Sequence, residues 1–167
     1  SIYREQAARL GKSYPMNFAD NALMFRSGNP KPCGTPAEIL AQGKHFYEEL
    51  SPETGEFFNT MLDNELLDVL STPGKRAGGY CTSLGDYHVP FIFANFNGTQ
   101  HDVEVVTHEA GHAFAAWLNR DRIPQSYIWP SLEACEVHSM SMEFFAWPWA
   151  EGFFGEDTRK FRYSHLA

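Results

Sequence analysis

One five-residue segment of the chain, His108-Glu109-Ala110-Gly111-His112, carries the pattern HExxH. Residues four apart lie on one face of a helix, so the imidazoles of His108 and His112 can bind a single metal ion. Imidazole nitrogen is a preferred ligand of zinc. Glu109 lies beside the pair but off its axis, where its carboxylate can accept a proton from a water activated by the metal. The pattern predicts a zinc centre with Glu109 as general base; two exposed histidines on a polar face are the alternative.

A catalytic zinc ion needs a third protein ligand, and the segment 131–145 offers three acidic residues on nearly one face of a helix, Glu133, Glu136 and Glu143. Glu136 follows His112 at a distance that allows a turn and a returning helix. The rest of this helix is largely apolar, and carboxylates are not buried without partners. We expect one of the three to bind the metal and the others to orient the histidine rings. Spacing alone does not choose among them, and a solvated acidic face is the alternative.

The elements that must position these residues are mainly helices. Thr35-Pro36 and Ser51-Pro52 are helix starts, with a capping residue followed by proline at the first helical position. Apolar residues recur at helical spacing through the HExxH segment, where Gly111 would cost about 1 kcal/mol relative to alanine. That cost indicates that another element approaches closely there. The expected helices cover residues 3–10, 36–50, 52–70, 100–118 and 132–146, with another beginning near 157.

Residues 78–98 differ from the rest, because glycines flank aromatic and β-branched residues. They predict two short strands, 79–83 and 91–96, joined by a turn. The fold class expected is therefore mainly α (α+β), with a small antiparallel sheet next to the HExxH helix. We interpret residues 1–167 as a single domain, made of a helical part (1–75), a small β part (76–98) and the zinc-site helices (99–167).

Composition restricts the partners. The 167 residues are 43% hydrophobic and 20% charged, as in globular domains. A net charge of -8 disfavours electrostatic binding to nucleic acid or anionic lipid. No apolar run approaches the roughly 18–20 residues of a membrane span. The three cysteines are far apart and outside any CxxC pair, which indicates reduced thiols and a cytoplasmic location.

The segments HEAGHAF and EVHSMSMEFF together resemble the oligoendopeptidase F branch of the thimet-oligopeptidase-like zinc metallopeptidases. GTPAEILAQGKHFYEELSPETGEFF, GGYCT and PFIFANFNGT are also similar to that branch, so the resemblance covers essentially the whole chain. It implies a zincin-like helical catalytic core that hydrolyses short peptides and binds one zinc ion per chain. It also implies that His108, His112 and Glu136 are the zinc ligands and that Glu109 is the general base, which leaves Glu133 and Glu143 to support the ligands.

Members of that branch are several times longer than this chain, and their later portion carries tyrosine and histidine residues that support the tetrahedral intermediate. We therefore expect a fragment of the catalytic region, whose exposed aromatic residues would self-associate or contact the remainder of a longer chain. Two alternatives to a zinc metalloendopeptidase stay open. One is a zinc-binding but catalytically incomplete fragment, and the other is a related zinc carboxypeptidase.

Residues for substrate binding are expected around the two strands. Phe93, Ala94 and Asn95 would lie on an edge strand that can pair with an extended peptide. Gly79 permits close backbone approach, and His88 in the turn could reach the cleft. An ordinary sheet strand and an ordinary turn are the alternatives. The other histidines are interpreted as structural or surface residues; in particular, His138 is expected to point away from the metal, and His45 and His165 to lie on the surface.

Overall fold

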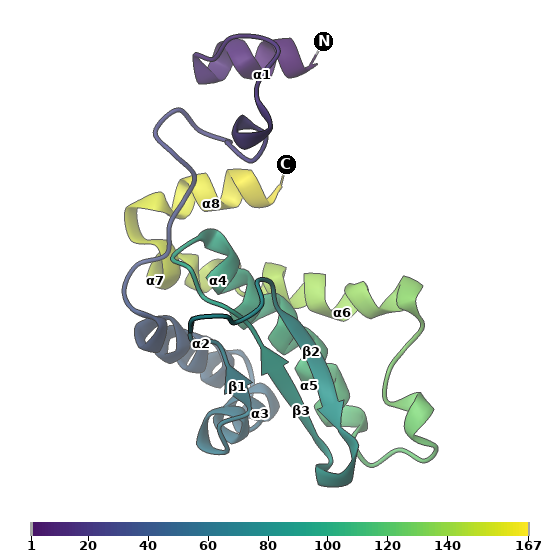
Figure 1. Cartoon of the computed structure of the whole chain (residues 1–167). Helices are drawn as coiled ribbons and strands as arrows, with labels where there is room; N and C mark the ends of the chain where they lie inside the picture. Colours follow the sequence, from purple (N-terminus) through teal and green to yellow (C-terminus); the bar gives the residue numbers. More distant parts are fainter. Residues whose placement is uncertain (1, 167) are drawn as a thin grey trace.

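A computed structural model describes residues 2–166, and helices make up most of it (Figure 1). The prediction of a mainly helical fold with a small sheet is confirmed. The helices are α1 (Ile2–Leu10), α2 (Pro36–Leu50), α3 (Pro52–Asp63), α4 (Gln100–Glu104), α5 (Ala110–Asn119), α6 (Leu132–Phe145), α7 (Ala150–Phe154) and α8 (Thr158–His165). The strands are β1 (Leu67–Asp68), β2 (Tyr80–Leu84) and β3 (Val89–Phe93).

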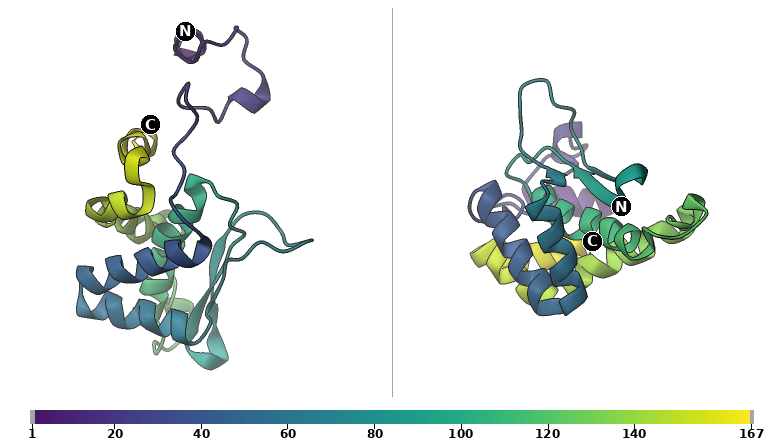
Figure 2. Two further views of the ribbon diagram at one scale, coloured as in Figure 1. Left: turned by 90° about the vertical axis from the view of Figure 1, so that its left-hand side faces the viewer. Right: turned by 90° about the horizontal axis from the view of Figure 1, so that it is seen from below.

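Helices α2 and α3 form an antiparallel pair beside the sheet (Figure 2). At the start of α2, Thr35 and Glu38 make a capping box, in which the Glu38 amide donates to Thr35 Oγ1 and the Thr35 amide donates to the Glu38 carboxylate. Ser51 caps α3 through the amide of Thr54. Fully buried side chains from this pair form much of the core: Phe46, Tyr47, Phe57, Phe58 and Met61.

The end of α3 differs from the prediction, which continued this helix to residue 70. The helix ends at Asp63, and Glu65 adopts a left-handed backbone with φ of 54°. The apolar residues that follow do not form another helical turn; Leu67–Asp68 forms β1 instead. Helical spacing of apolar residues is misleading here, because the same residues can also bury themselves as an extended segment against a sheet.

The sheet is mixed, with the order β1-β3-β2. Strand β2 pairs antiparallel with β3, as predicted, but β1 pairs parallel with it. The segment 91–96, expected at an edge, is therefore flanked on both sides, with Ile92 donating to Leu66 O and Phe96 to Val69 O. The exposed edge of the described sheet beside the HExxH segment belongs to β2.

Residues 100–119, called the HExxH helix below, are not one regular α-helix. Between α4 and α5 lies a π-helical turn, η3 (Val105–Glu109). Such turns disrupt the regular ladder of backbone hydrogen bonds and are common at functional sites. Here the hydroxyl of buried Tyr47 donates to Val106 O at 2.9 Å. A Cβ atom on Gly43 of α2 would lie only 2.6 Å from Val106 Cγ1, so α2 fits tightly against this turn.

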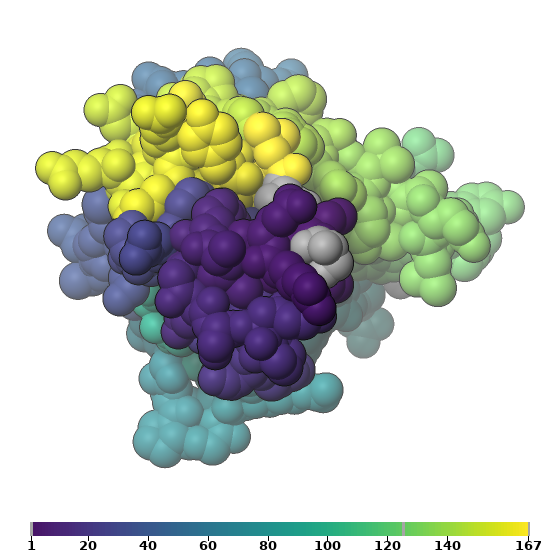
Figure 3. All heavy atoms as spheres, turned by 90° about the horizontal axis from the view of Figure 1, so that it is seen from above, coloured from purple at the N-terminus to yellow at the C-terminus, as the bar shows by residue number. Residues whose placement is uncertain are grey.

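Helices α1 and α8 lie on the same side of the molecule (Figure 1). After α6 the chain turns back through α7, and α8 lies above the HExxH helix in Figure 1. Seen from above, the N-terminal residues form a lobe beside α8 (Figure 3). An extended segment joins this lobe to α2, and Cys33 in it donates its amide to Phe153 O at 2.7 Å. Among the helices within residues 2–166, none combines the length and the apolar character needed to cross a membrane.

The hydrogen bond between Tyr47 and Val106 gives a test of the π-helical turn. Tyr47→Phe should lower the free energy of unfolding by about 1–3 kcal/mol, because a buried carbonyl loses its donor. Urea unfolding followed by circular dichroism measures this. Tyr87→Phe is the matched control, since Tyr87 is 78% exposed, and it should change stability by less than about 0.5 kcal/mol. Equal stability of the two variants would contradict a supporting role for Tyr47.

Candidate metal centre

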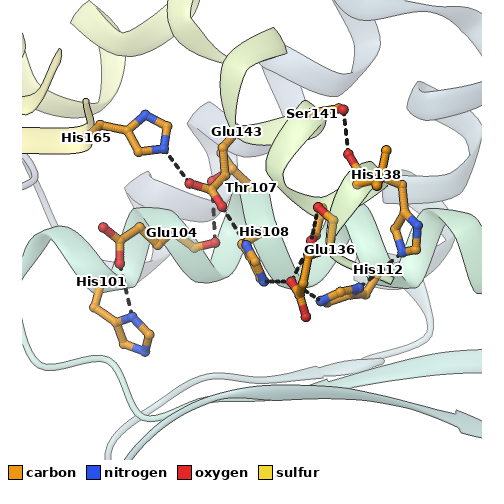
Figure 4. Close-up of polar contacts among 12 residues, drawn as sticks. His101, Glu104, Thr107, His108, His112, Glu136, His138, Ser141, Glu143 and His165 are labelled. Carbon is orange, nitrogen blue, oxygen red and sulfur yellow. Dashed lines mark hydrogen bonds and ion pairs between the residues drawn. The ribbon is translucent and has the colours of Figure 1, made fainter. Parts of the chain in front are cut away.

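Three side chains from the HExxH helix and α6 converge on one point (Figure 4). Glu136 Oε2 lies 3.1 Å from His108 Nε2 and 3.5 Å from His112 Nε2. One ligand atom from each of the three lies within 4.8 Å of the others. A tetrahedral zinc ion with bonds near 2.1 Å would hold its ligand atoms about 3.4 Å apart. The donor types and their spacing therefore fit a metal ion bound by two imidazoles and one carboxylate.

The position of Glu136 depends on the close packing of α6 against α5. A Cβ atom built on Gly111 would lie 2.8 Å from Ser139 Cα and 3.1 Å from Met142 Cβ. The prediction that something approaches Gly111 closely is confirmed, and the approaching element is α6. On that helix Ser139 is fully buried, and its hydroxyl donates to Glu136 Oε2 at 3.0 Å. The same contact that excludes a side chain at 111 thus places and orients the third donor.

The ring of His108 is oriented by Glu143, whose Oε1 lies 2.5 Å from His108 Nδ1. An ionised carboxylate can only accept, so Nδ1 carries the proton and Nε2 keeps the lone pair that a metal needs. This hydrogen bond raises the pKa of His108. Burial alone would raise the pKa of Glu143, but its hydrogen bonds with His108 and His165 outweigh burial and lower it to about 2. Glu143 is therefore an ionised acceptor that fixes the orientation of His108.

The ring of His112 has a different partner. Its Nδ1 lies 3.1 Å from Nε2 of His138, the residue that precedes Ser139 on α6. If His112 offers Nε2 to a metal, its Nδ1–H donates to His138. Burial lowers the pKa of both rings, which favours their neutral forms. As expected, His138 is not among the three converging donors, but α6 packs close enough for its side chain to reach the Nδ1 side of His112.

Glu109 lies in the same cleft and faces β2. Burial raises the pKa of its carboxyl; the charge of His108 opposes this, and that of Glu136 adds to it. The backbone of Cys81 on β2 also contributes a hydrogen bond that lowers the pKa. Burial, together with the Glu109 charge, raises the pKa of the Cys81 thiol, which keeps it protonated. A half-buried carboxylate beside the metal donors and an exposed strand is suited to exchange protons with a bound water.

Two residues considered for the site lie away from it. Glu133 is exposed in the first turn of α6, and hydrogen bonds with its own backbone and with Ser131 lower its pKa. Its side chain does not reach the histidines. His88 follows the turn after β2 with φ of 54°, and its Nδ1 lies 3.1 Å from Arg120 O at the far end of the hairpin. His88 therefore does not lie near the candidate metal donors.

The residues considered for substrate binding lie at the end of β3 and the start of β2. Ala94 is fully buried, and Asn95 donates to the backbone carbonyls of residues 75 and 76. Phe93 stacks on Tyr80 with ring centroids 5.2 Å apart. Gly79 packs against the HExxH helix, because a Cβ atom there would lie 3.2 Å from Val105 Cγ2. These positions shape the sheet beside the site, whereas β2 presents the free edge.

The sequence places His165 on the surface, but its side chain is only 12% exposed in the structure. Its Nε2 lies 2.5 Å from Glu143 Oε2, and Trp147 donates its indole N–H to His165 Nδ1 at 2.8 Å. The burial of His165 could have been inferred from its spacing, because it follows the buried Phe161 by four residues and so lies on the same face of α8. The partner residue Glu143 cannot be identified from spacing, since the contact joins two helices.

Comparison with known proteins decides the family. Residues 44–160 match the family model for Peptidase family M3, and this range holds the HExxH helix and Glu136. The chain belongs to peptidase family M3. Within this M3 chain, the matched range also includes β2, β3 and most of the α2–α3 pair.

Several relatives of this M3 chain are named oligopeptidase or oligoendopeptidase F, which confirms the resemblance stated from the sequence. Oligopeptidase PepF of Bacillus subtilis (strain 168) is 30% identical over 95 residues, covering 56% of this chain and 14% of PepF. A solved structure of a candidate oligoendopeptidase F from Bacillus anthracis str. Ames is 52% identical with a TM-score of 0.92, covering 99% of this chain and 30% of that one. PZ peptidase A, solved with an inhibitor, is 51% identical with a TM-score of 0.91, covering 99% and 29%. The M3 chain thus spans less than a third of the length of these relatives.

The contact at Gly111 predicts that a methyl group there separates α5 from α6. Gly111→Ala should destabilise the chain by about 1–3 kcal/mol through overpacking and weaken zinc binding, because Glu136 moves with α6. Zinc titration against a competing chelator, with urea unfolding in parallel, measures both effects. Gly152→Ala is the control, since there the new Cβ meets only the flexible end of Gln42. Wild-type zinc affinity in Gly111→Ala would show that α6 is not fixed by this contact.

The low pKa of Glu143 predicts an acid dependence of stability. Its folded value of about 2 lies below the ordinary 4.5, so the ionised group stabilises the fold above pH 4.5, and this contribution is lost as the pH falls towards 2. In metal-free protein, the stability difference between wild type and Glu143→Gln should shrink over that range. Glu151→Gln, which makes the same change at an exposed position of α7, is the matched control. A pH-independent difference for Glu143→Gln would contradict the assignment.

Proposed function

We propose that this chain carries the metal-binding part of a zinc-dependent metalloendopeptidase that hydrolyses peptide bonds in short peptides. The single observation that carries the proposal is the convergence of His108, His112 and Glu136 on one point, with the Glu109 carboxylate in the same cleft. Membership of a peptidase family and the oligoendopeptidase relatives support the substrate class. A net charge of -8 gives no support to a nucleic-acid-binding role.

The donor set supports zinc as the metal, with one ion per chain. Two neutral imidazoles and one carboxylate are a ligand set found in catalytic zinc sites, which keep a fourth position open. His108 and His112 each use Nδ1 in a hydrogen bond, to Glu143 and His138 respectively, which leaves Nε2 free on both rings. When bound, the zinc ion would supply Lewis acidity that acidifies a water molecule and polarises a peptide carbonyl.

In the proposed mechanism Glu109 moves the protons. Its carboxylate, at a pKa raised by burial, accepts a proton from the attacking water and so generates hydroxide for attack on the carbonyl carbon. The peptide C–N bond then breaks, and Glu109 passes the same proton to the leaving amine. The carboxylate is regenerated, and one water has been consumed for each bond cleaved. A raised pKa suits this group, because a catalytic acid and base works best when its pKa lies near the operating pH.

Strand β2 is the proposed place for the substrate backbone. The amides of Ile92 and Ala94 donate towards the β1 side of β3, so the alternation of a strand turns the neighbouring amides towards β2. Cys81 and Ser83 on β2 lie opposite Ile92 and Pro90, so they direct their backbone groups away from β3. An extended peptide can add there as a further strand, beside Glu109. Phe93, Ala94, Asn95 and Gly79 would then act by holding β2 in place.

A second candidate function is a zinc-binding segment that is catalytically incomplete by itself. The observation that favours it is coverage, since this chain spans 30% of the solved oligoendopeptidase-like structure and 14% of PepF. Groups that stabilise the tetrahedral intermediate would then come from outside these 167 residues. A zinc carboxypeptidase differs in its products, because it would release single residues from the C-terminus rather than cut internally.

The experiment follows cleavage of a quenched fluorescent peptide of about eight residues by the zinc-loaded chain. Glu109→Gln should keep one zinc ion per chain and lose at least about 100-fold in kcat/KM, because the proton acceptor is gone. A chelator should abolish turnover. Mass spectrometry of the products distinguishes internal cuts from stepwise C-terminal release.

Glu133→Gln is the matched control, since it removes an exposed carboxylate of the same size from α6 and should leave both zinc and turnover unchanged. Undiminished hydrolysis by Glu109→Gln would exclude Glu109 as the base. A wild-type chain that binds one zinc ion but shows no turnover would favour the incomplete segment. A wild-type chain that binds no zinc would overturn the proposal.

A further inference from the structure

We propose that His165, on α8, is a positioning residue for the metal ligand His108 and acts through Glu143. This inference rests on the proposed function, because it assigns a role towards the metal that His108 would bind. The hydrogen bonds, the burial and the aromatic contacts of His165 all support this role. They make α8, remote in sequence from the HExxH motif, part of the metal centre.

Glu143 joins the two histidines with its two oxygens. Oε1 is 2.5 Å from His108 Nδ1, and Oε2 is 2.5 Å from His165 Nε2. Figure 4 shows His165 on the opposite side of the carboxylate from His108. With one oxygen on each ring, the carboxylate cannot rotate without breaking a hydrogen bond. The His165 side chain on α8 therefore fixes the plane of the Glu143 carboxylate, which in turn orients the His108 ring.

The tautomer of His165 follows from Trp147. An indole N–H can only donate, and it lies 2.8 Å from His165 Nδ1, which must therefore be the acceptor. In the neutral ring the proton is then on Nε2, where it donates to Glu143 Oε2. The hydrogen bonds run in one direction, from Trp147 through His165 to Glu143. Glu143 accepts from both sides, which satisfies it as an ionised carboxylate.

The ring of His165 is held by more than hydrogen bonds. It stacks on Phe161 with centroids 5.4 Å apart and planes 16° apart, and on Phe144 at 5.1 Å and 28°. Its side chain and that of Glu143 are 12% and 14% exposed. Because little water reaches these two side chains, water competes poorly with His165 for the hydrogen bond to Glu143 Oε2. Without His165 the carboxylate would lose the contact that orients it, whereas His108 would still be present.

Zinc affinity of the 167-residue chain, measured by competition with a chelator, tests the inference. His165→Gln and His165→Asn form a matched pair, because a glutamine amide reaches the position of Nε2 and an asparagine amide stops near Nδ1. His165→Asn should weaken zinc binding about tenfold, the lower end for loss of a group outside the ligand shell, and His165→Gln should restore most of it. If His165 acted through packing alone, these two variants would bind zinc with equal affinity.

Two further measurements keep the test decisive if a variant folds poorly. In the metal-free wild type, ¹⁵N chemical shifts of the imidazoles should report the Nε2–H tautomer for His165 and the Nδ1–H tautomer for His108. Trp147→Phe keeps His165 but removes the donor to its Nδ1, so zinc affinity should fall by a smaller factor, while the Nε2–H tautomer should persist because Glu143 still accepts from Nε2.

Equal zinc affinity of wild type, His165→Asn and His165→Gln would overturn the inference, as would an Nδ1–H tautomer of His165 in the wild type. Failure of the wild type to bind zinc would instead overturn the proposed function. In that case the imidazole shifts would still decide whether the hydrogen-bonded chain from Trp147 to His108 exists.

Discussion

The candidate metal site depends on the distance between α5 and α6, which is set where Gly111 meets Ser139 and Met142. No side chain fits between the two backbones at that point. This allows Glu136 to reach the two histidines across the interface, and it allows His138 to reach His112. Helix α2 also fits closely, because a Cβ atom on Gly43 would collide with the Val106 side chain. The HExxH helix is thus held between two neighbours, and a glycine permits the close approach of each.

Three carboxylates surround the candidate site, and their surroundings give them different properties. Burial raises the pKa of Glu109, while hydrogen bonds from Cys135 and Ser139 lower that of Glu136. Two histidine partners lower the pKa of Glu143 to about 2, although burial opposes them. One carboxylate is therefore suited to exchange a proton, one is exposed for a metal, and one stays ionised as a support. The different roles come from neighbours on separate elements and not from residue type.

Local features of the site could be predicted from the sequence. The HExxH pattern, the capping residues of α2 and α3 and the close approach at Gly111 all follow from neighbouring residues, and the structure contains them. Features that depend on partners distant in sequence could not be predicted. The Tyr47 hydroxyl donates to the π-helical turn, β1 pairs with the free side of β3, and His165 contacts Glu143. Glu133 and Glu143 look alike by spacing, and only packing separates the exposed one from the buried one.

The π-helical turn has a consequence for how the chain tolerates changes in length. The backbone of Val105–Glu109 forms a turn that is wider than a turn of α-helix. A π-helical turn holds one residue more than an α-helical turn, so the segments on its two sides keep their facing while the extra residue is absorbed. A further inserted residue would instead rotate the preceding segment by about 100° relative to the histidines. Val106 could then no longer face Tyr47 while His108 faced α6, so the two contacts limit the segment between α4 and His112 to its present length or one residue less.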